Sequence, residues 1–230
     1  MLSAIAIIPS APVLVPELAG AAADEVAELR AAMIAAVTTL PPRWIAVGVG
    51  ASDGVVGPEV VGTFAGFGVD LPVRLSPQAT GRPVELPLCA LIAGWIRAQA
   101  QAQPDAAVQV RVFADSHDNS TAVDLGRQLR NEIDQSTDPI GVLVVADGAN
   151  TLTPAAPGGH QPADVDVQRA LDDALACGDL AALTRLPAQV RGRVAFGVLA
   201  GLVEPVPRSA KELYRAAPYG VGYFAGVWQP

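Results

Sequence analysis

The chain is poor in the side chains that most often form disulfides, metal sites and nucleic-acid surfaces. Among 230 residues it has two cysteines, two histidines and a single lysine, Lys211. Cys89 and Cys177 lack the CxxC spacing of zinc or redox sites, so we expect buried free thiols in a reducing compartment. The net charge of −8 argues against nucleic-acid binding, because a phosphate backbone is recognised by a basic surface.

Long apolar runs are also absent, although 51% of the residues are hydrophobic and the mean hydropathy is +0.35. Pro, Gly or a charged residue breaks each apolar stretch before the roughly 18 residues that a membrane-spanning helix needs. The N-terminal run has no basic segment before it and is interrupted by Pro9, Pro12 and Pro16, which is not typical of a secretion signal. We therefore expect a cytoplasmic protein without a membrane partner.

The apolar residues that are present alternate between two kinds of pattern. Four short β-rich runs predict strands, and the segments between them have helical spacing, which is typical of an α/β fold. The predicted strands are Leu2–Ile8, Trp44–Val49, Val108–Phe113 and Ile140–Val145. Because these runs are almost continuously apolar, they predict a mostly parallel or mixed sheet with helices on both faces. No linker or change in composition marks a boundary, so we expect one domain over residues 1–230.

Helix ends give a second set of expectations. Asn119 or Ser120 can cap the helix that follows the third strand, and Gly178 can end the helix that follows the fourth. A glycine-rich segment, residues 219–228, predicts a closing strand.

Polar residues stand directly after each predicted strand. In an open α/β sheet the ligand crevice lies beyond the carboxyl ends of the strands, so these residues predict a polar pocket. The candidate pocket residues are Ser10, Ser52, Asp53, Asp115, His117, Asp147 and Asn150, together with His160 in the Gly158–Gly159 turn. Asp147-Gly148 has two interpretations, a wall of the site or a local Asx turn, and we favour the turn.

The N-terminal segment resembles the class III extradiol ring-cleavage dioxygenases of the LigB-like superfamily, which has Memo-like relatives. That family has a Pro-His-Pro-Pro-Leu-Leu-Val-Pro-Glu pattern at the end of its first strand. The matching residues here are Pro9, Pro12, Leu14, Val15, Pro16 and Glu17. Three further segments are similar to bacterial members of the family: Leu143–Asn150, Ala156–Gly158 with Gly178–Asp179, and Ala217–Phe224. The resemblance covers nearly the whole chain and implies the extradiol dioxygenase fold.

The resemblance also implies which residues would bind metal, and those residues are missing. The family holds Fe(II) with two histidines and a carboxylate, but Ser10 replaces the first histidine. Gly50–Asp53 stands where the second is expected. A hydroxyl is a weak ligand for Fe(II) compared with an imidazole, so we expect no cofactor. The alternative is a relocated Fe(II) site made from His117, His160 and Asp147, or with Asp115 as the carboxylate.

Three classes of function therefore remain open. The favoured hypothesis is a metal-free homologue that binds a small molecule or a protein in the crevice. A second is a divergent enzyme, either a dioxygenase with the relocated site or a metal-independent catalyst that uses Ser10, Asp53 or Asp147. A serine-hydrolase version would require an imidazole within hydrogen-bond reach of Ser10. The third is a structural or assembly component that acts through self-association.

Overall fold

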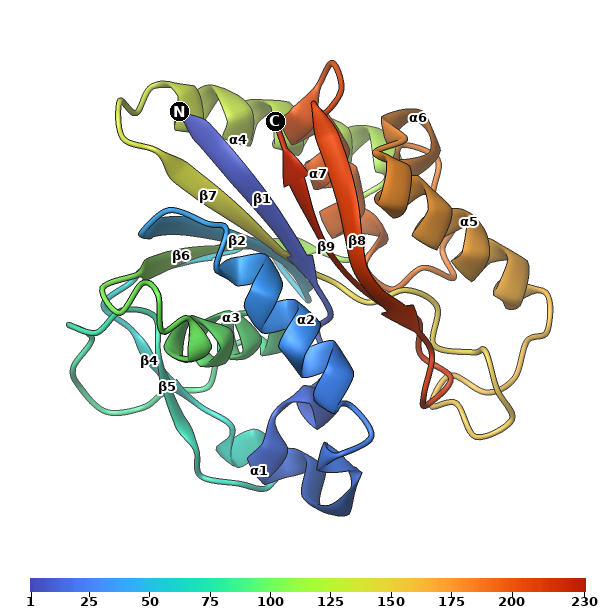
Figure 1. The fold of residues 1–230 in the computed structure, drawn as a ribbon, viewed down its shortest axis with the longest axis horizontal. Helices are drawn as coiled ribbons and strands as arrows, with labels where there is room; N and C mark the ends of the chain where they lie inside the picture. Colours follow the sequence, from blue (N-terminus) through green and yellow to red (C-terminus); the bar gives the residue numbers. More distant parts are fainter.

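A seven-stranded mixed sheet forms the centre of the computed structural model, which describes all residues from 1 to 230 (Figure 1). Its strands are β1 (Leu2–Ile8), β2 (Arg43–Gly50), β3 (Gly54–Val56), β6 (Ala107–Ala114), β7 (Ile140–Val145), β8 (Ser209–Ala216) and β9 (Tyr223–Gln229). The spatial order is β3-β6-β2-β7-β1-β9-β8. The four central strands, β6, β2, β7 and β1, run parallel, so their carboxyl ends meet at one edge. The outer strands β3, β9 and β8 are antiparallel to their neighbours.

Helices cover both faces of this sheet, as the apolar strands predicted. One face packs against α2 (Ala27–Val37) and α3 (Leu88–Gln99), and the other against α4 (Asn119–Asp134), α5 (Asp164–Cys177), α6 (Leu180–Leu183) and α7 (Arg193–Val203). A short helix, α1 (Pro16–Ala19), and a two-stranded sheet of β4 (Val61–Thr63) and β5 (Pro72–Arg74) lie on the α2/α3 side (Figure 1). The buried apolar residues form two clusters, one on each face.

The four strands predicted from β-rich runs are confirmed, the first and fourth with the expected bounds and the other two with an added residue at each end. The closing strand predicted over residues 219–228 is also present, as β9, but it begins only at Tyr223. Two details differ. The cap of α4 is Asp118 rather than Asn119 or Ser120, because Asp118 is still extended and its carboxylate accepts the Thr121 N–H at 2.7 Å. Gly178 does end α5 in a left-handed conformation, but Cys177 beside it is exposed instead of buried, whereas Cys89 is buried.

Helix α7 is held against α4 by an unusually close contact. A Cβ atom at Gly126 of α4 would lie 2.1 Å from the Val198 carbonyl oxygen, and one at Gly201 of α7 would lie 2.0 Å from the Val123 carbonyl oxygen. Only glycine permits this approach of two helix backbones. The contact holds α7 against α4, and the first residues of α7 lie at the carboxyl edge of the sheet.

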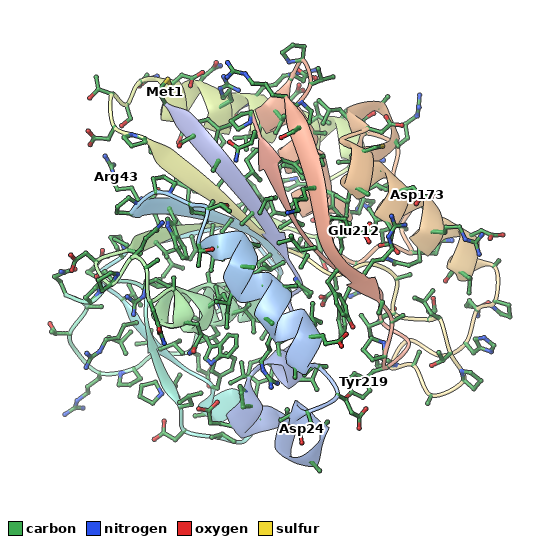
Figure 2. The ribbon with its side chains drawn as sticks, viewed as in Figure 1. Met1, Asp24, Arg43, Asp173, Glu212 and Tyr219 are labelled. Carbon is green, nitrogen blue, oxygen red and sulfur yellow. The ribbon has the colours of Figure 1, made fainter.

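The two edges of the parallel strands are occupied differently. Both chain termini lie at the amino edge (Figure 1), where the Met1 ammonium donates hydrogen bonds to the carbonyl oxygens of Ile133, Ser136 and Asp138. Figure 2 shows Tyr219 at the other end of the molecule, beside the turn that contains Asp24. The Tyr219 hydroxyl donates to the Glu25 carboxylate at 3.0 Å. The carboxyl edge is thus built from loops.

Candidate functional site

A cavity of about 510 Å³ lies at the carboxyl edge, where all four parallel strands end. Its walls come from the ends of the strands and from the start of α7. The lining includes Ser10 after β1, Val49–Ala51 at the end of β2, Asp115 after β6, Val145–Asp147 at the end of β7, the segment Val190–Val194, and Leu88 with Ala188. The volume is within the range of pockets that bind small molecules.

Asp147 joins two of these walls. Its carboxylate accepts the Ser10 backbone N–H at 2.7 Å, so the loop after β7 is tied to the loop after β1. The favoured interpretation of a local Asx turn was wrong, because the carboxylate bonds the loop after the neighbouring strand instead of its own turn. Burial raises the pKa of Asp147 to about 6, against the opposing effects of the Ser10 N–H and the charge of Arg191. A carboxyl with such a pKa can be neutral or charged close to physiological pH.

The segment before α7 is fastened to the same loop. The Gly192 N–H donates to the Asp147 carbonyl at 2.8 Å, and the Arg191 N–H donates to the Gly148 carbonyl at 3.1 Å. A Cβ atom at Gly192 would lie 2.5 Å from the Ala146 Cβ and 2.8 Å from the Asp147 carbonyl oxygen, so this close approach requires glycine. The result is that two arginines are placed on the wall of the cavity.

These arginines differ in how they are held. The Arg193 guanidinium donates to the Asn119 side-chain oxygen at 3.0 Å and to the Asp115 carbonyl oxygen at 3.1 Å. Arg191 is exposed and its guanidinium makes no hydrogen bond or ion pair within the protein. Neither arginine faces a carboxylate partner at ion-pair distance, so both positive charges remain unneutralised by direct contact.

A buried glutamine, Gln168, supports the loop after β7. Gln168 of α5 accepts the Ala149 N–H at 2.8 Å and donates to the Asp172 carboxylate at 2.7 Å. Cβ atoms at Gly148 and Gly222 would each come within 2.1 Å of the Gln168 side chain, so both glycines make room for it. Burial raises the pKa of Asp172 to about 6, although the Gln168 hydrogen bond acts in the opposite direction.

The cavity gathers three of the eight sequence-predicted residues, Ser10, Asp115 and Asp147. The other five, Ser52, Asp53, His117, Asn150 and His160, do not line it. Asp53 and His117 instead pair with each other at 2.8 Å outside the cavity. The Asp53 carboxylate also accepts the Ala114 N–H at 2.7 Å, and these contacts hold the pKa of Asp53 below its usual value.

Sequence reasoning missed Arg191 and Arg193. Their segment reaches the cavity through an isolated antiparallel bridge between Ala149 and Val190, a long-range contact that has no local sequence signature. The available signal was the Arg191-Gly192-Arg193 sequence just before an apolar run, which could have marked the start of a helix at a polar edge.

The residues present do not fit an Fe(II) facial triad. No group of three or more His, Cys, Asp or Glu side chains lies close enough together to hold a metal ion, so His117, His160 and Asp147 are not brought together. No imidazole lines the cavity. Neither histidine hydrogen-bonds the Ser10 hydroxyl, and His117 is engaged by Asp53, so the serine-hydrolase hypothesis is dropped.

Comparisons with known proteins agree on the fold alone. No protein-family model matches the chain, and no curated protein matches it. The crystal structure of an uncharacterized protein from Escherichia coli K12 is similar with a TM-score of 0.58 at 10% sequence identity, covering 99% of this chain and 100% of that one. The chain therefore shares a fold with that protein over its full length. None of its helices combines the length and the apolar character needed to cross a membrane.

Proposed function

We propose that this protein is a metal-free homologue of the class III extradiol dioxygenases that binds a small molecule at the carboxyl edge of its sheet. The observation that carries the proposal is the cavity of about 510 Å³, which lies where ligands bind in open α/β folds and is lined by Ser10, Asp147 and two arginines instead of histidines. A cavity with a few converging polar groups is the usual form of a small-molecule site.

Blocking the cavity tests this proposal. Ala188 is exposed on the cavity wall, so Ala188→Trp fills the cavity without disturbing the core. Ala65 is also exposed but lies outside the cavity, so Ala65→Trp is the matched control. We expect fragments detected by NMR to bind the original protein and the Ala65→Trp variant, and to lose at least about tenfold in affinity on Ala188→Trp. If the affinities of a diverse set of fragments are unchanged by Ala188→Trp, the proposal is overturned.

Iron retention tests the metal-free part separately. After anaerobic loading with Fe(II) and desalting, we expect iron far below one equivalent, and the same amount in a variant that combines His117→Ala with His160→Ala. One equivalent of iron that disappears in the double variant would instead establish the relocated site.

A metal-independent catalyst is the second candidate, and the raised pKa of Asp147 in the cavity favours it. A carboxyl that titrates near pH 6 can exchange a proton with a bound ligand. Fragments that bind the cavity would be incubated with the protein and followed by mass spectrometry. Turnover that disappears in Asp147→Asn, while binding persists, would support this candidate.

A further inference from the structure

Positive charge collects on one wall of the cavity in an otherwise acidic protein. Arg191 and Arg193 both line the cavity, and neither forms an ion pair. The oxygens that hold Arg193 belong to an amide and a backbone carbonyl, so they position its guanidinium without neutralising it. Arg191 makes no hydrogen bond or ion pair with another side chain, although its charge acts on Asp147 from a longer distance. One guanidinium that is positioned and one that is free, both without a carboxylate at ion-pair distance, suit an oxyanion in geometry and in charge.

The start of α7 adds unsatisfied backbone donors beside the arginines, where Val194 lines the cavity and Ala195 directly follows it. The residue at the cap position, Gly192, has no side chain that could accept a hydrogen bond. The backbone N–H groups of Val194 and Ala195 have no acceptor within the protein, although both residues are buried. The first N–H groups of a helix normally find a capping side chain, water or a ligand, and the helix dipole favours an anion there.

Asp147 provides the opposite polarity in the same cavity. One oxygen of its carboxyl group accepts the Ser10 N–H, whereas the other accepts no hydrogen bond from the protein. Asp147 is partly exposed and lines the cavity, so its free oxygen is available to a ligand donor. The cavity thus has a donor-rich wall and a separate acceptor.

We infer that the ligand is a small organic anion that also carries a hydroxyl or amino group. Its carboxylate or phosphate is bound by Arg191, Arg193 and the first N–H groups of α7, and its hydroxyl or amino group donates a hydrogen bond to Asp147. This inference rests on the proposed function, since it names the chemistry of the ligand that the cavity binds.

Three probes test the inference: inorganic phosphate, 3-hydroxybenzoate and its neutral analogue 3-hydroxybenzamide. Binding is followed by titration at constant ionic strength, with the amide NMR signals of Gly192, Val194 and Ala195 as local reporters. We expect 3-hydroxybenzoate to shift these signals and to bind at least tenfold more tightly than 3-hydroxybenzamide. Tighter binding of phosphate than of 3-hydroxybenzoate would identify a phosphate-bearing ligand, and the reverse order a carboxylate.

The variants locate the anion. Arg191→Gln removes an exposed guanidinium that has no partner in the protein, so the fold is retained and anion affinity is expected to fall at least tenfold. Arg208→Gln is the matched control, because Arg208 is exposed and lies far from the cavity. Its backbone N–H donates to the Gln229 carbonyl oxygen near the amino edge of β1, opposite the cavity. Benzoate, a fourth probe used only for this comparison, lacks the hydroxyl donor, so Asp147→Ala is expected to weaken the binding of 3-hydroxybenzoate more than that of benzoate.

Two outcomes would overturn the inference. If 3-hydroxybenzamide binds the cavity as tightly as 3-hydroxybenzoate, and Arg191→Gln changes neither, the cavity binds small molecules without anion recognition and the proposed function stands alone. If none of the three probes shifts the α7 signals, the inference also fails. If other fragments bind the original protein and lose affinity on Ala188→Trp, the proposed function is still supported. If no fragment binds in this way, the inference and the proposed function both fail.

Discussion

Asp147 and Asp53 lie at the same edge of the sheet and make the same primary contact, yet their environments drive their pKa values apart. Each carboxylate accepts one backbone N–H at 2.7 Å. Asp147 follows a central strand and is enclosed by the loop after β1 and the start of α7, and burial raises its pKa to about 6. Asp53 lies toward the outer strands and is largely exposed, and its pKa is lowered by the Ala114 N–H and by His117.

The difference shows that a single hydrogen bond does not determine the charge state of a carboxyl group at a strand end. A hydrogen bond to the charged form lowers a pKa by the same mechanism at both sites, so the desolvation at the centre of the sheet decides the outcome. The central loop is therefore where a chemically responsive carboxyl is expected, and the outer loop holds a conventional surface pair.

The largest expected effect comes from breaking the enclosure of Asp147. Gly192→Ala places a Cβ atom against the Ala146 Cβ and the Asp147 carbonyl oxygen, and neither of these atoms can move without a shift of the backbone. We expect a loss of about 3 kcal/mol in the free energy of unfolding, measured by urea denaturation. Gly66→Ala is the control, since a Cβ atom there meets nothing within 4 Å, and it should be neutral or slightly stabilising. Equal effects of the two substitutions would contradict the close approach.

The next effect comes from removing the support behind the central loop. Gln168→Leu leaves the Ala149 N–H and the Asp172 carboxylate without their buried partner. We expect a loss of about 2 kcal/mol in urea denaturation at pH 7. Gln128→Leu on the exposed side of α4 should change stability by less than about 0.5 kcal/mol. A neutral Gln168→Leu variant would show that the loop does not depend on this contact.

The pH dependence of stability distinguishes the two carboxyl groups. The folded-state pKa of Asp147 is raised from 3.8 to about 6, so the stability that comes from the protonated form is present below pH 4 and is lost as the pH rises through 6. Asp147→Asn prevents this loss of stability, because the amide does not ionise as the pH rises. We expect the variant to be more stable than the original protein by roughly 2 kcal/mol at pH 8, with the difference vanishing near pH 4. Thermal or urea denaturation across this pH range measures it, and a variant that is less stable at pH 8 would contradict the raised pKa.

The smallest effect is expected at the outer carboxylate, Asp53. Its contribution to stability changes with pH in the direction opposite to that of Asp147. Because the folded-state pKa of Asp53 is lowered, its contribution is present above its ordinary pKa and is lost as the pH falls through the lowered value. Asp53→Asn should cost well under 1 kcal/mol at pH 7, because an exposed pair with His117 is screened by solvent. The same urea series measures it. A cost comparable to that of Gln168→Leu would mean that the outer pair is as important as the central loop.

Much of the central fold was predictable because its strands carry a strong local signal. Leu2–Ile8 and Ile140–Val145 are nearly continuous apolar runs, and the structure confirms both. The sequence did not predict β8, whose SAKELYRA sequence is polar at the edge of the sheet, or α7, which is buried on all sides and so has no polar face to reveal a helical period.

The candidate site divides in the same way. Ser10, Asp115 and Asp147 were predicted because parallel strands bring their carboxyl ends to one edge. Arg191 and Arg193 depend on a bridge between Ala149 and Val190, and His117 pairs with Asp53 outside the cavity. Both are tertiary contacts between segments distant in sequence, which composition and periodicity do not report.

The outer position of β8 has a consequence for how this protein meets copies of itself. An exposed edge strand offers unpaired backbone groups on which another chain could extend the sheet, and such pairing leads to aggregation. Here the register of β8 is interrupted between Glu212 and Tyr214, and Lys211 and Arg215 place charge on either side of the irregularity. A bulged and charged edge is a poor template, so the β8 edge of the sheet resists pairing with a strand of another chain.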